Sequence, residues 1–171
     1  MEITEKEFTD IIKDNEERLK HLSRVYADRM DEEQDIYQEI AIQLWRSLPT
    51  FNGKANINTW VYRLAVNTAI SFARKKRTRQ NYYSKFKKEK GARHNMTGAL
   101  TNASEDERVV TLYDAISELN PSEKAIITMY LEEFSYEEIA FVTDITENYV
   151  GVKLHRIKNK LSNIIEEKNG S

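Results

Sequence analysis

The sequence is short of the residues that most often carry covalent or metal chemistry. It contains no cysteine among 171 residues, which excludes disulfides, thiolate catalysis and cysteine-based zinc or iron–sulfur sites. Its histidines, His21, His94 and His155, are too scattered to suggest a metal site. No carboxylate cluster and no nucleophile beside a base stands out either. We therefore expect no metal site, no cofactor and no enzyme.

Long apolar runs and chain-breaking residues are also scarce. No apolar stretch approaches the roughly 18 residues that span a bilayer, and the first residues, MEITEKEF, lack the basic and apolar regions of a signal peptide. The expected location is therefore the cytoplasm, without membrane insertion. Only two prolines and five glycines interrupt the chain, and alternating apolar and polar residues are rare, so we expect an all-α fold.

What the sequence does contain is charge, arranged in blocks. The formal net charge is −2, but residues 74–93 hold ten Lys or Arg and a single acid, whereas residues 105–147 hold twelve acids and two basic residues. Residues 153–160 are basic again. Separate basic surfaces on an acidic chain indicate a protein that touches a polyanion at two places and a second protein in between.

The second of three helices expected in the first half carries a polar face. This helix begins at Asp31, ends at Pro49, and places a wide apolar face, which includes Trp45, toward the core. Ordinary solvation would explain the opposite face, and docking of a partner is the alternative. The residues considered for docking are Asp35, Gln38, Glu39 and Gln43.

A polar loop and the third helix form the first predicted nucleic-acid surface. The loop, residues 51–56, offers an aromatic ring, amides and a glycine, which suit stacking on and hydrogen bonding to an unpaired base. In the helix, an apolar stripe that includes Trp60 is expected to be core. A solvated cationic helix end would explain the remaining face equally well. The candidate DNA-binding residues are Phe51, Asn52, Gly53, Lys54, Asn56, Tyr62, Arg63, Asn67, Arg74, Lys75 and Arg77.

Periodicity is lost after the third helix, which divides the chain into two small helical domains. Residues 87–106 read as a flexible linker between a domain of residues 1–86 and a domain of residues 107–171. Tyr82 and Tyr83, just before the linker, could stack on nucleic acid or simply continue the third helix.

The second domain contains a helix-turn-helix pattern. A helix capped by Ser135, a tight turn at residues 143–145 and a longer basic helix capped by Thr146 follow one another. In such a unit the second helix can lie in the major groove, although a generic helical hairpin would give a similar pattern. The outward, candidate DNA-binding residues of that helix are Asn148, Tyr149, Val152, Lys153, His155, Arg156 and Lys158.

Taken in order, these motifs resemble the extracytoplasmic-function group of sigma-70 family sigma factors, the promoter-recognition subunits of bacterial RNA polymerase. The resemblance covers most of residues 8–166. It rests on Asp35-Ile36-Tyr37-Gln38-Glu39, Leu44-Trp45-Arg46-Ser47-Leu48-Pro49, Phe51-Asn52-Gly53, Thr59 to Asn67, Leu119-Asn120-Pro121, Ser135 to Ala140 and Val150 to Leu161.

The resemblance implies a role for each surface. The polar face of the second helix would dock on the clamp helices of the polymerase's largest subunit, and the partners would also include the polymerase flap and an anti-sigma factor. The loop at residues 51–56 would hold a flipped base of the minus-ten element, the third helix would separate strands and contact phosphates, and the last helix would read the minus-thirty-five element. Gly151 and Val152 depart from the basic residue and serine that are frequent in that family, and Asp144 replaces the usual turn glycine.

Two other classes of function compete with this interpretation. A stand-alone helix-turn-helix transcription regulator would bind duplex DNA by itself, but it would leave residues 31–77 without a role. A nucleic-acid enzyme would need clustered carboxylates or an activated nucleophile, which the sequence lacks.

Overall fold

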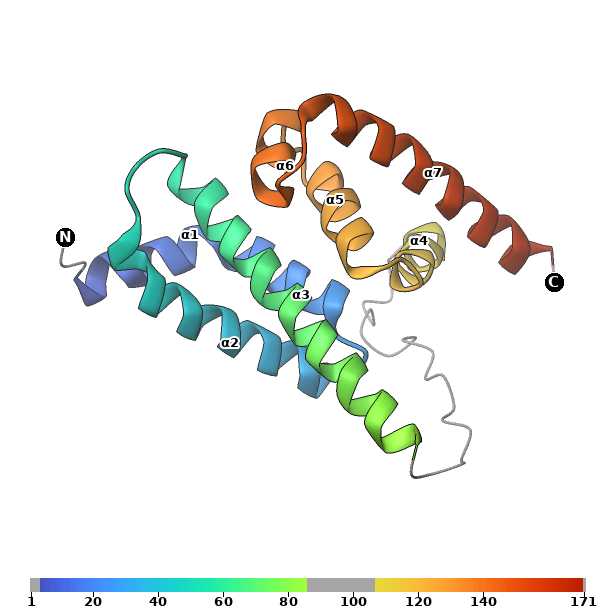
Figure 1. Ribbon diagram of the computed structural model, residues 1–171, viewed down its shortest axis with the longest axis horizontal. Coiled ribbons are helices and arrows are strands. Elements are labelled where there is room, and N and C mark those ends of the chain that lie inside the picture. The colour runs from blue at the N-terminus through green and yellow to red at the C-terminus, as the bar shows by residue number, and fades with distance from the viewer. Residues whose placement is uncertain (1–3, 86–106, 171) are drawn as a thin grey trace.

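The computed structural model describes residues 4–85 and 107–170, and these residues form α-helices, one 3-10 turn and no strand (Figure 1). The expected all-α fold is confirmed. The predicted linker at residues 87–106 lies outside the described residues. The elements are α1 Glu5–Tyr26, α2 Met30–Ser47, η1 Leu48–Thr50, α3 Ile57–Ser84, α4 Glu107–Ser117, α5 Pro121–Leu131, α6 Tyr136–Thr143 and α7 Glu147–Asn169.

Local capping motifs fix where most helices begin. The side chains of Thr4, Asn120 and Ser135 each accept a hydrogen bond from the backbone N–H three residues on. The backbone N–H of each cap residue donates in turn to the carboxylate of the glutamate at that position. Thr146 caps α7 in the simpler way, through its hydroxyl. Asp144 ends α6 in the left-handed conformation, with φ 56°, so the turn expected without a glycine does form.

The first three helices form a bundle with its own apolar centre. The centre is built from residues at helical spacing on α1, α2 and α3, as the sequence periodicity predicts. Trp45 is an exception, because it is 52% exposed rather than part of the buried face. The buried side chains include Leu19, Leu22, Ile36, Ile40, Leu44, Val61 and Ala65.

The last four helices form the C-terminal half, with α7 as its long outer member. Helix α7 packs against α4, α5 and α6 and lies on the side away from α1 to α3 (Figure 1). Every third or fourth residue of α7 is buried, as expected for one apolar stripe. The buried side chains of this half include Ile116, Met129, Ile139, Val150, Leu154 and Ile157.

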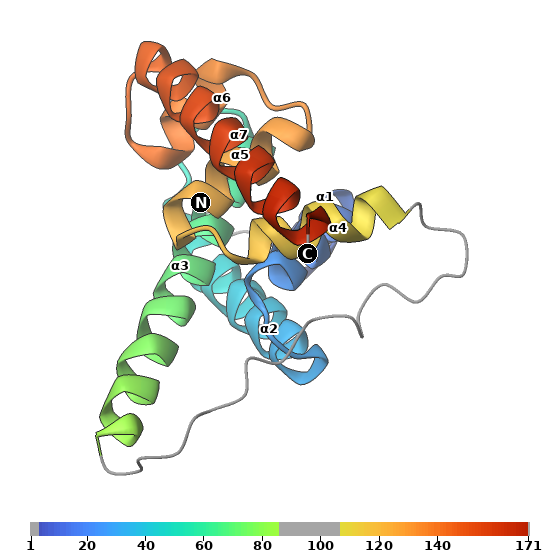
Figure 2. The same cartoon turned by 90° about the vertical axis from the view of Figure 1, so that its right-hand side faces the viewer.

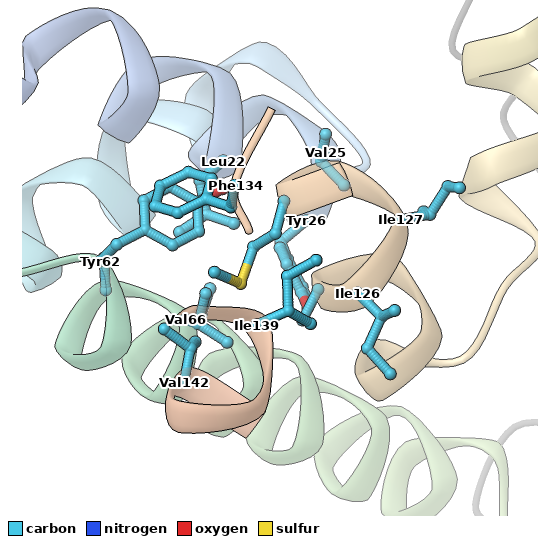
Figure 3. Close-up of a cluster of buried hydrophobic side chains, with 14 of the residues drawn as sticks. Leu22, Val25, Tyr26, Tyr62, Val66, Ile126, Ile127, Phe134, Ile139 and Val142 are labelled. Carbon is cyan, nitrogen blue, oxygen red and sulfur yellow. The ribbon is translucent and has the colours of Figure 1, made fainter. Parts of the chain in front are cut away.

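The two halves pack directly on each other and share one continuous core. Helix α3 contacts α5 and α6, while α1 contacts α4 and α5. Figure 3 shows side chains of both halves pointing into this contact, among them Leu22 and Tyr62 from one half and Phe134 and Ile139 from the other. The rings of Tyr62 and Phe134 lie 4.8 Å apart. Helix α3 therefore buries two faces, one inside its own bundle and one against the C-terminal half.

Candidate nucleic-acid interface

The polar face of α2 is exposed and partly apolar. Asp35 and Gln38 are exposed, whereas Glu39 and Gln43 are half-buried and joined by a hydrogen bond of 2.8 Å between their side chains. At alternating spacings of three and four residues after Asp35 and Gln38 come Ile42, 44% exposed, and Trp45, 52% exposed. Neither residue is among the docking residues predicted from the sequence, although their spacing from Gln38 places them on the same face of the helix. An exposed apolar pair bordered by polar groups is typical of a protein–protein contact surface.

The ring of Trp45 is oriented by a contact with α1. It makes an edge contact with Phe8 of α1, at 4.9 Å between ring centroids. Such a contact orients a ring while leaving its other face accessible. The α2 face therefore presents a fixed aromatic group beside exposed polar ones, which suits docking better than simple solvation does.

The loop before α3 is fixed by its own polar groups. The Asn52 side chain accepts a hydrogen bond from the Lys54 backbone at 3.2 Å, and the Asn56 side chain accepts one from Asn58 at 2.9 Å, which caps α3. Gly53 has φ 71°, a conformation that other residues adopt only with strain. The candidate base-binding loop is therefore preorganised, with Asn52 and Lys54 exposed.

The aromatic ring of the loop is already partly used. Phe51 is half-buried and packs on Trp60, with 5.3 Å between ring centroids. Trp60 is itself only half-buried, so it sits at the edge of the core rather than inside it. A base entering this loop would meet the rim of a paired aromatic unit, with exposed amides beside it.

The expectation that Tyr62 lies on a free face of α3 is wrong. Tyr62 is 1% exposed, because the C-terminal half covers this part of α3 and places Phe134 on its ring. Burial raises the pKa of the Tyr62 hydroxyl well above its ordinary value, and the nearby Glu132 carboxylate raises this pKa further. In this arrangement Tyr62 is a core residue of the contact between the halves.

Arg63, one residue on, is occupied by the C-terminal half as well. Its Nη2 donates to both carboxylate oxygens of Asp144, at 2.8 and 3.0 Å, and its guanidinium lies 4.7 Å from the Phe141 ring centroid. Asp144 belongs to the turn of the helix-turn-helix unit. The turn that precedes α7 thus also covers Arg63, a predicted minus-ten residue.

Further polar contacts join the halves. The Thr59 hydroxyl donates to Glu138 at 3.0 Å, and the Tyr26 hydroxyl donates to the Pro121 carbonyl. The pKa of Glu138 is lowered, chiefly by the Ser135 backbone N–H and further by Thr59. These bonds make the contact specific, because each one is lost if the halves slide past one another.

The His21 ring adds another polar link between the halves, after those of Arg63, Thr59 and Tyr26. Its Nδ1 lies 2.6 Å from Glu132 and its Nε2 lies 2.6 Å from the Tyr113 hydroxyl. One imidazole of α1 therefore bridges two elements of the C-terminal half.

Beyond Arg63 the two halves diverge and leave a cleft of about 500 Å³. Asn67 and Arg74 of α3 line one wall, and Tyr149 and Lys153 of α7 line the other. The Lys153 ammonium lies 5.5 Å from the Tyr149 ring centroid, so these two side chains turn toward the cleft together. The structure thus brings together residues that the sequence assigned to two different DNA elements.

The C-terminal end of α3 is a projecting helix end with exposed basic side chains. It projects past the rest of the bundle (Figure 2) and carries the exposed side chains of Arg74, Lys75, Arg77 and Arg79. Among the described residues none of these four makes an ion pair, in contrast to Lys76, which binds Asp28 and Glu32 of the bundle. Arg74, Lys75 and Arg79 line a shallow hollow together with Tyr82 and Tyr83, which continue the helix. Unpaired cations in a row suit a phosphate backbone.

The outward residues of α7 divide into two groups. Asn148, Val152, His155 and Arg156 are exposed on the face opposite the buried stripe, which includes Leu154. The remaining candidates lie on the flanks: Tyr149 and Lys153 border the cleft, and Lys158 lies 4.0 Å from the Tyr130 ring centroid.

No helix in the described parts of the chain is both long enough and apolar enough to cross a membrane. Among those same residues, no group of three or more His, Cys, Asp or Glu side chains could hold a metal ion.

Comparison with known proteins places two family regions on the two halves. The description "Sigma-70 region 2" matches residues 11–79, and "Sigma-70, region 4" matches residues 110–161. The first therefore covers α1 to α3 up to the basic end, and the second covers the helix-turn-helix unit with most of α4 and α7.

Two relatives align over most of the chain. The ECF RNA polymerase sigma-E factor of Haemophilus influenzae is 31% identical over 147 residues, which are 77% of this chain and 74% of that protein. The RNA polymerase sigma factor SigV of Bacillus subtilis is 30% identical over 147 residues, covering 85% of this chain and 82% of that protein.

A solved structure shares the fold over nearly the whole chain. It is the sigma factor RpoE of Bartonella quintana, crystallised in complex with the anti-sigma factor NepR, and it aligns with a TM-score of 0.73 at 18% identity. The alignment covers 94% of this chain and 98% of that one, so both halves are included.

Proposed function

Because this chain belongs to the extracytoplasmic-function sigma factors of the sigma-70 family, it is an alternative sigma factor that directs RNA polymerase to promoters, and we propose how its surfaces divide that work. It acts in the cytoplasm by binding, without a cofactor and without catalysis of its own. The observation that carries the division is that the two exposed surfaces with candidate DNA-binding residues, the basic end of α3 and the outer face of α7, match different sigma regions.

The exposed face of α2 is the proposed docking surface for the clamp helices of the largest polymerase subunit. Asp35 and Gln38 supply polar contacts, while Ile42 and Trp45 supply apolar area that is accessible in the free protein. Burying an exposed tryptophan gives the largest contribution of any single residue on this face, since aromatic anchors dominate most interfaces.

The preorganised loop at residues 51–56 is the proposed pocket for a flipped base of the minus-ten element. Its geometry is set before DNA arrives, so capture of the base does not also have to order the loop. The energy of capture offsets the few kcal/mol needed to unstack a base, and melting can proceed without ATP. Arg74, Lys75 and Arg77 would then hold the neighbouring phosphates.

The packed halves must separate before both promoter elements are bound. The two elements are centred about 25 base pairs apart, which is about 85 Å of B-form DNA. In the structure Asn67 of α3 and Lys153 of α7 line one cleft, and Tyr62 and Arg63 are covered. We therefore infer that the described arrangement is a closed form and that binding to polymerase favours an open one.

The cleft between α3 and α7 is the proposed site for an anti-sigma factor. Its lining includes the apolar Ile70 and Ile126 and the cations Arg74 and Lys153, while the carboxylate of Asp144, which also lines it, is paired with Arg63. An amphipathic segment with an acidic edge fits that combination, and its binding would hold the halves together.

The first test is co-elution of the full chain with bacterial core RNA polymerase on a sizing column, with binding to duplex DNA alone measured alongside. Trp45→Ala should weaken core binding at least tenfold if this ring anchors the interface. Tyr136→Ala is the matched control, since Tyr136 is an exposed aromatic residue (42%) of the other half. Tight duplex binding without core association would instead indicate a stand-alone regulator and leave the α2 face without a partner.

A further inference from the structure

An exposed apolar side chain stands in the middle of the polar outer face of α7. Val152 is 44% exposed and has Asn148 one turn before it and Arg156 one turn after it. His155 completes the face. The buried Val150 and Leu154 point the other way, so Val152 contributes nothing to the core.

The position of Val152 in the fold indicates what its exposed side chain can contact. A single exposed valine is ordinary on most protein surfaces. Here, however, it lies in the second turn of α7, which follows the Asp144 turn, and this is the part of a helix-turn-helix unit that enters the major groove. A valine side chain can neither donate nor accept a hydrogen bond. The one apolar group on base edges in the major groove is the C5 methyl of thymine.

The neighbours of Val152 leave room for a short side chain to reach a base. Gly151 faces Tyr136 of α6, whose Cε2 an added Cβ would meet at 3.6 Å, so no side chain of residue 151 lies across Val152. Tyr149 and Lys153 turn toward the cleft between the halves rather than across Val152. The two methyl groups of Val152 are thus accessible from outside, between Asn148 and Arg156.

We propose that Val152 selects thymine at one position of the minus-thirty-five element by contact with its C5 methyl. This inference rests on the proposed function of α7 as the reader of that element, and it names the base and the atom group that are read. Burial of one methyl group against another favours thymine over a base that lacks it by about fourfold.

The experiment uses holoenzyme reconstituted from bacterial core polymerase and the full chain. A minus-thirty-five element is first selected from a promoter library randomised in that region. Each thymine of the selected element is then replaced singly by deoxyuridine, which keeps the base pair and removes only the methyl group. One position should lose about fourfold in affinity with the natural chain, and the loss should vanish in Val152→Ala. Val109→Ala, the same change at an exposed valine of α4, should behave as the natural chain does.

The other outcomes separate two failures. If a preferred element is selected but no thymine responds to deoxyuridine, or if the response persists in Val152→Ala, the inference about Val152 is overturned while α7 remains the reader. If the library shows no preference at minus thirty-five, the proposed role of α7 fails and the inference fails with it. Val152→Ile keeps a branched apolar side chain and should still lose affinity when deoxyuridine replaces thymine. That result would show that the effect of Val152→Ala comes from the lost methyl contact and not from a disturbed helix.

Discussion

The two surfaces that we assign to promoter DNA differ in what covers them. On α3, Tyr62 is buried and Arg63 is held by Asp144, both through contact with the C-terminal half. On α7, Val152 and Arg156 are exposed and turned away from the N-terminal half. The closed form therefore withholds the first surface while presenting the second. If these surfaces bind promoter DNA as we propose, duplex binding through α7 does not require the halves to separate, whereas minus-ten recognition through α3 does.

This difference assigns the control of promoter opening to the contact between the halves. The contact is aromatic and apolar at Tyr62 and Phe134, and polar around them at Thr59 and His21. Polymerase or an anti-sigma factor can shift the balance only by binding one form more tightly than the other. Substitutions in the contact should consequently change α3-dependent steps and leave α7-dependent steps alone.

The largest effect is expected from Phe134→Ala. Phe134 is 7% exposed and lies between the Tyr62 ring and the Arg18 guanidinium, each at 4.8 Å. Removing the ring leaves a cavity in the contact between the halves, and we expect the free energy of unfolding in urea to fall by about 3 kcal/mol. Tyr82→Ala, at a ring that is 63% exposed, should change it by less than about 0.5 kcal/mol. Similar losses in both variants would mean that Phe134 contributes no specific packing.

On α7, Gly151→Ala should change the stability of the protein without changing its DNA binding. A Cβ at this position would meet Tyr136 Cε2 at 3.6 Å, an ordinary contact, and alanine should stabilise α7 by roughly 1 kcal/mol. Because that Cβ points to α6 and not to the outer face of α7, the variant should bind minus-thirty-five DNA in the holoenzyme as tightly as the natural chain does. Ser162→Ala, on the exposed later part of α7, should not weaken this binding. Weaker DNA binding by a stabilised variant would show instead that the α7 backbone at Gly151 approaches the DNA closely.

A smaller effect is expected in the salt dependence of DNA affinity, which compares the α3 and α7 surfaces directly. In the free chain at low salt, Arg156→Ala should reduce the slope of log affinity against log salt by about one if Arg156 contacts a phosphate. Arg63→Ala should leave the slope of the free chain unchanged, because Asp144 already occupies the guanidinium. In the holoenzyme both variants should lose about one. An equal loss in the free chain would show that the halves are already apart in solution.

Sequence patterns predicted best the features that depend on neighbours in the chain. The caps of Ser135 and Thr146 formed because donor and acceptor are three residues apart, and the Asp144 turn formed because that residue tolerates a left-handed conformation. Helical periodicity likewise identified the core of each half. It also indicated that α3 has a second face, beside its apolar stripe, that can contact a partner.

Contacts between distant parts of the chain could not be predicted in the same way. Thr59 and Glu138 are 79 positions apart, and Arg63 and Asp144 are 81 apart. No periodicity encodes such a pairing, so the burial of Tyr62 against Phe134 was missed. A tyrosine beside an arginine on a helix is compatible both with a nucleic-acid surface and with the edge of a core. Only the arrangement of the two halves decides between these possibilities.

The smallest expected effect comes from Asp144→Asn, which tests whether the charge on Asp144 keeps Arg63 covered. Asparagine also tolerates the left-handed conformation that Asp144 adopts, with φ 56°, so the turn should persist. The carboxylate is 72% exposed and its pair with Arg63 contributes at most about 1 kcal/mol, so closure should weaken by less than about fivefold.

The readout of Asp144→Asn is the salt slope of the free chain. In this background Arg63→Ala, silent in the natural chain, should begin to lower that slope, because the guanidinium is now free to meet a phosphate. Glu118→Gln is the matched control, since it removes a carboxylate that pairs with Lys168 inside the C-terminal half, at 2.8 Å. If Arg63→Ala stays silent in the Asp144→Asn background, packing at Phe141 and Tyr62 rather than charge keeps α3 covered. The aromatic contact alone would then account for the closed form.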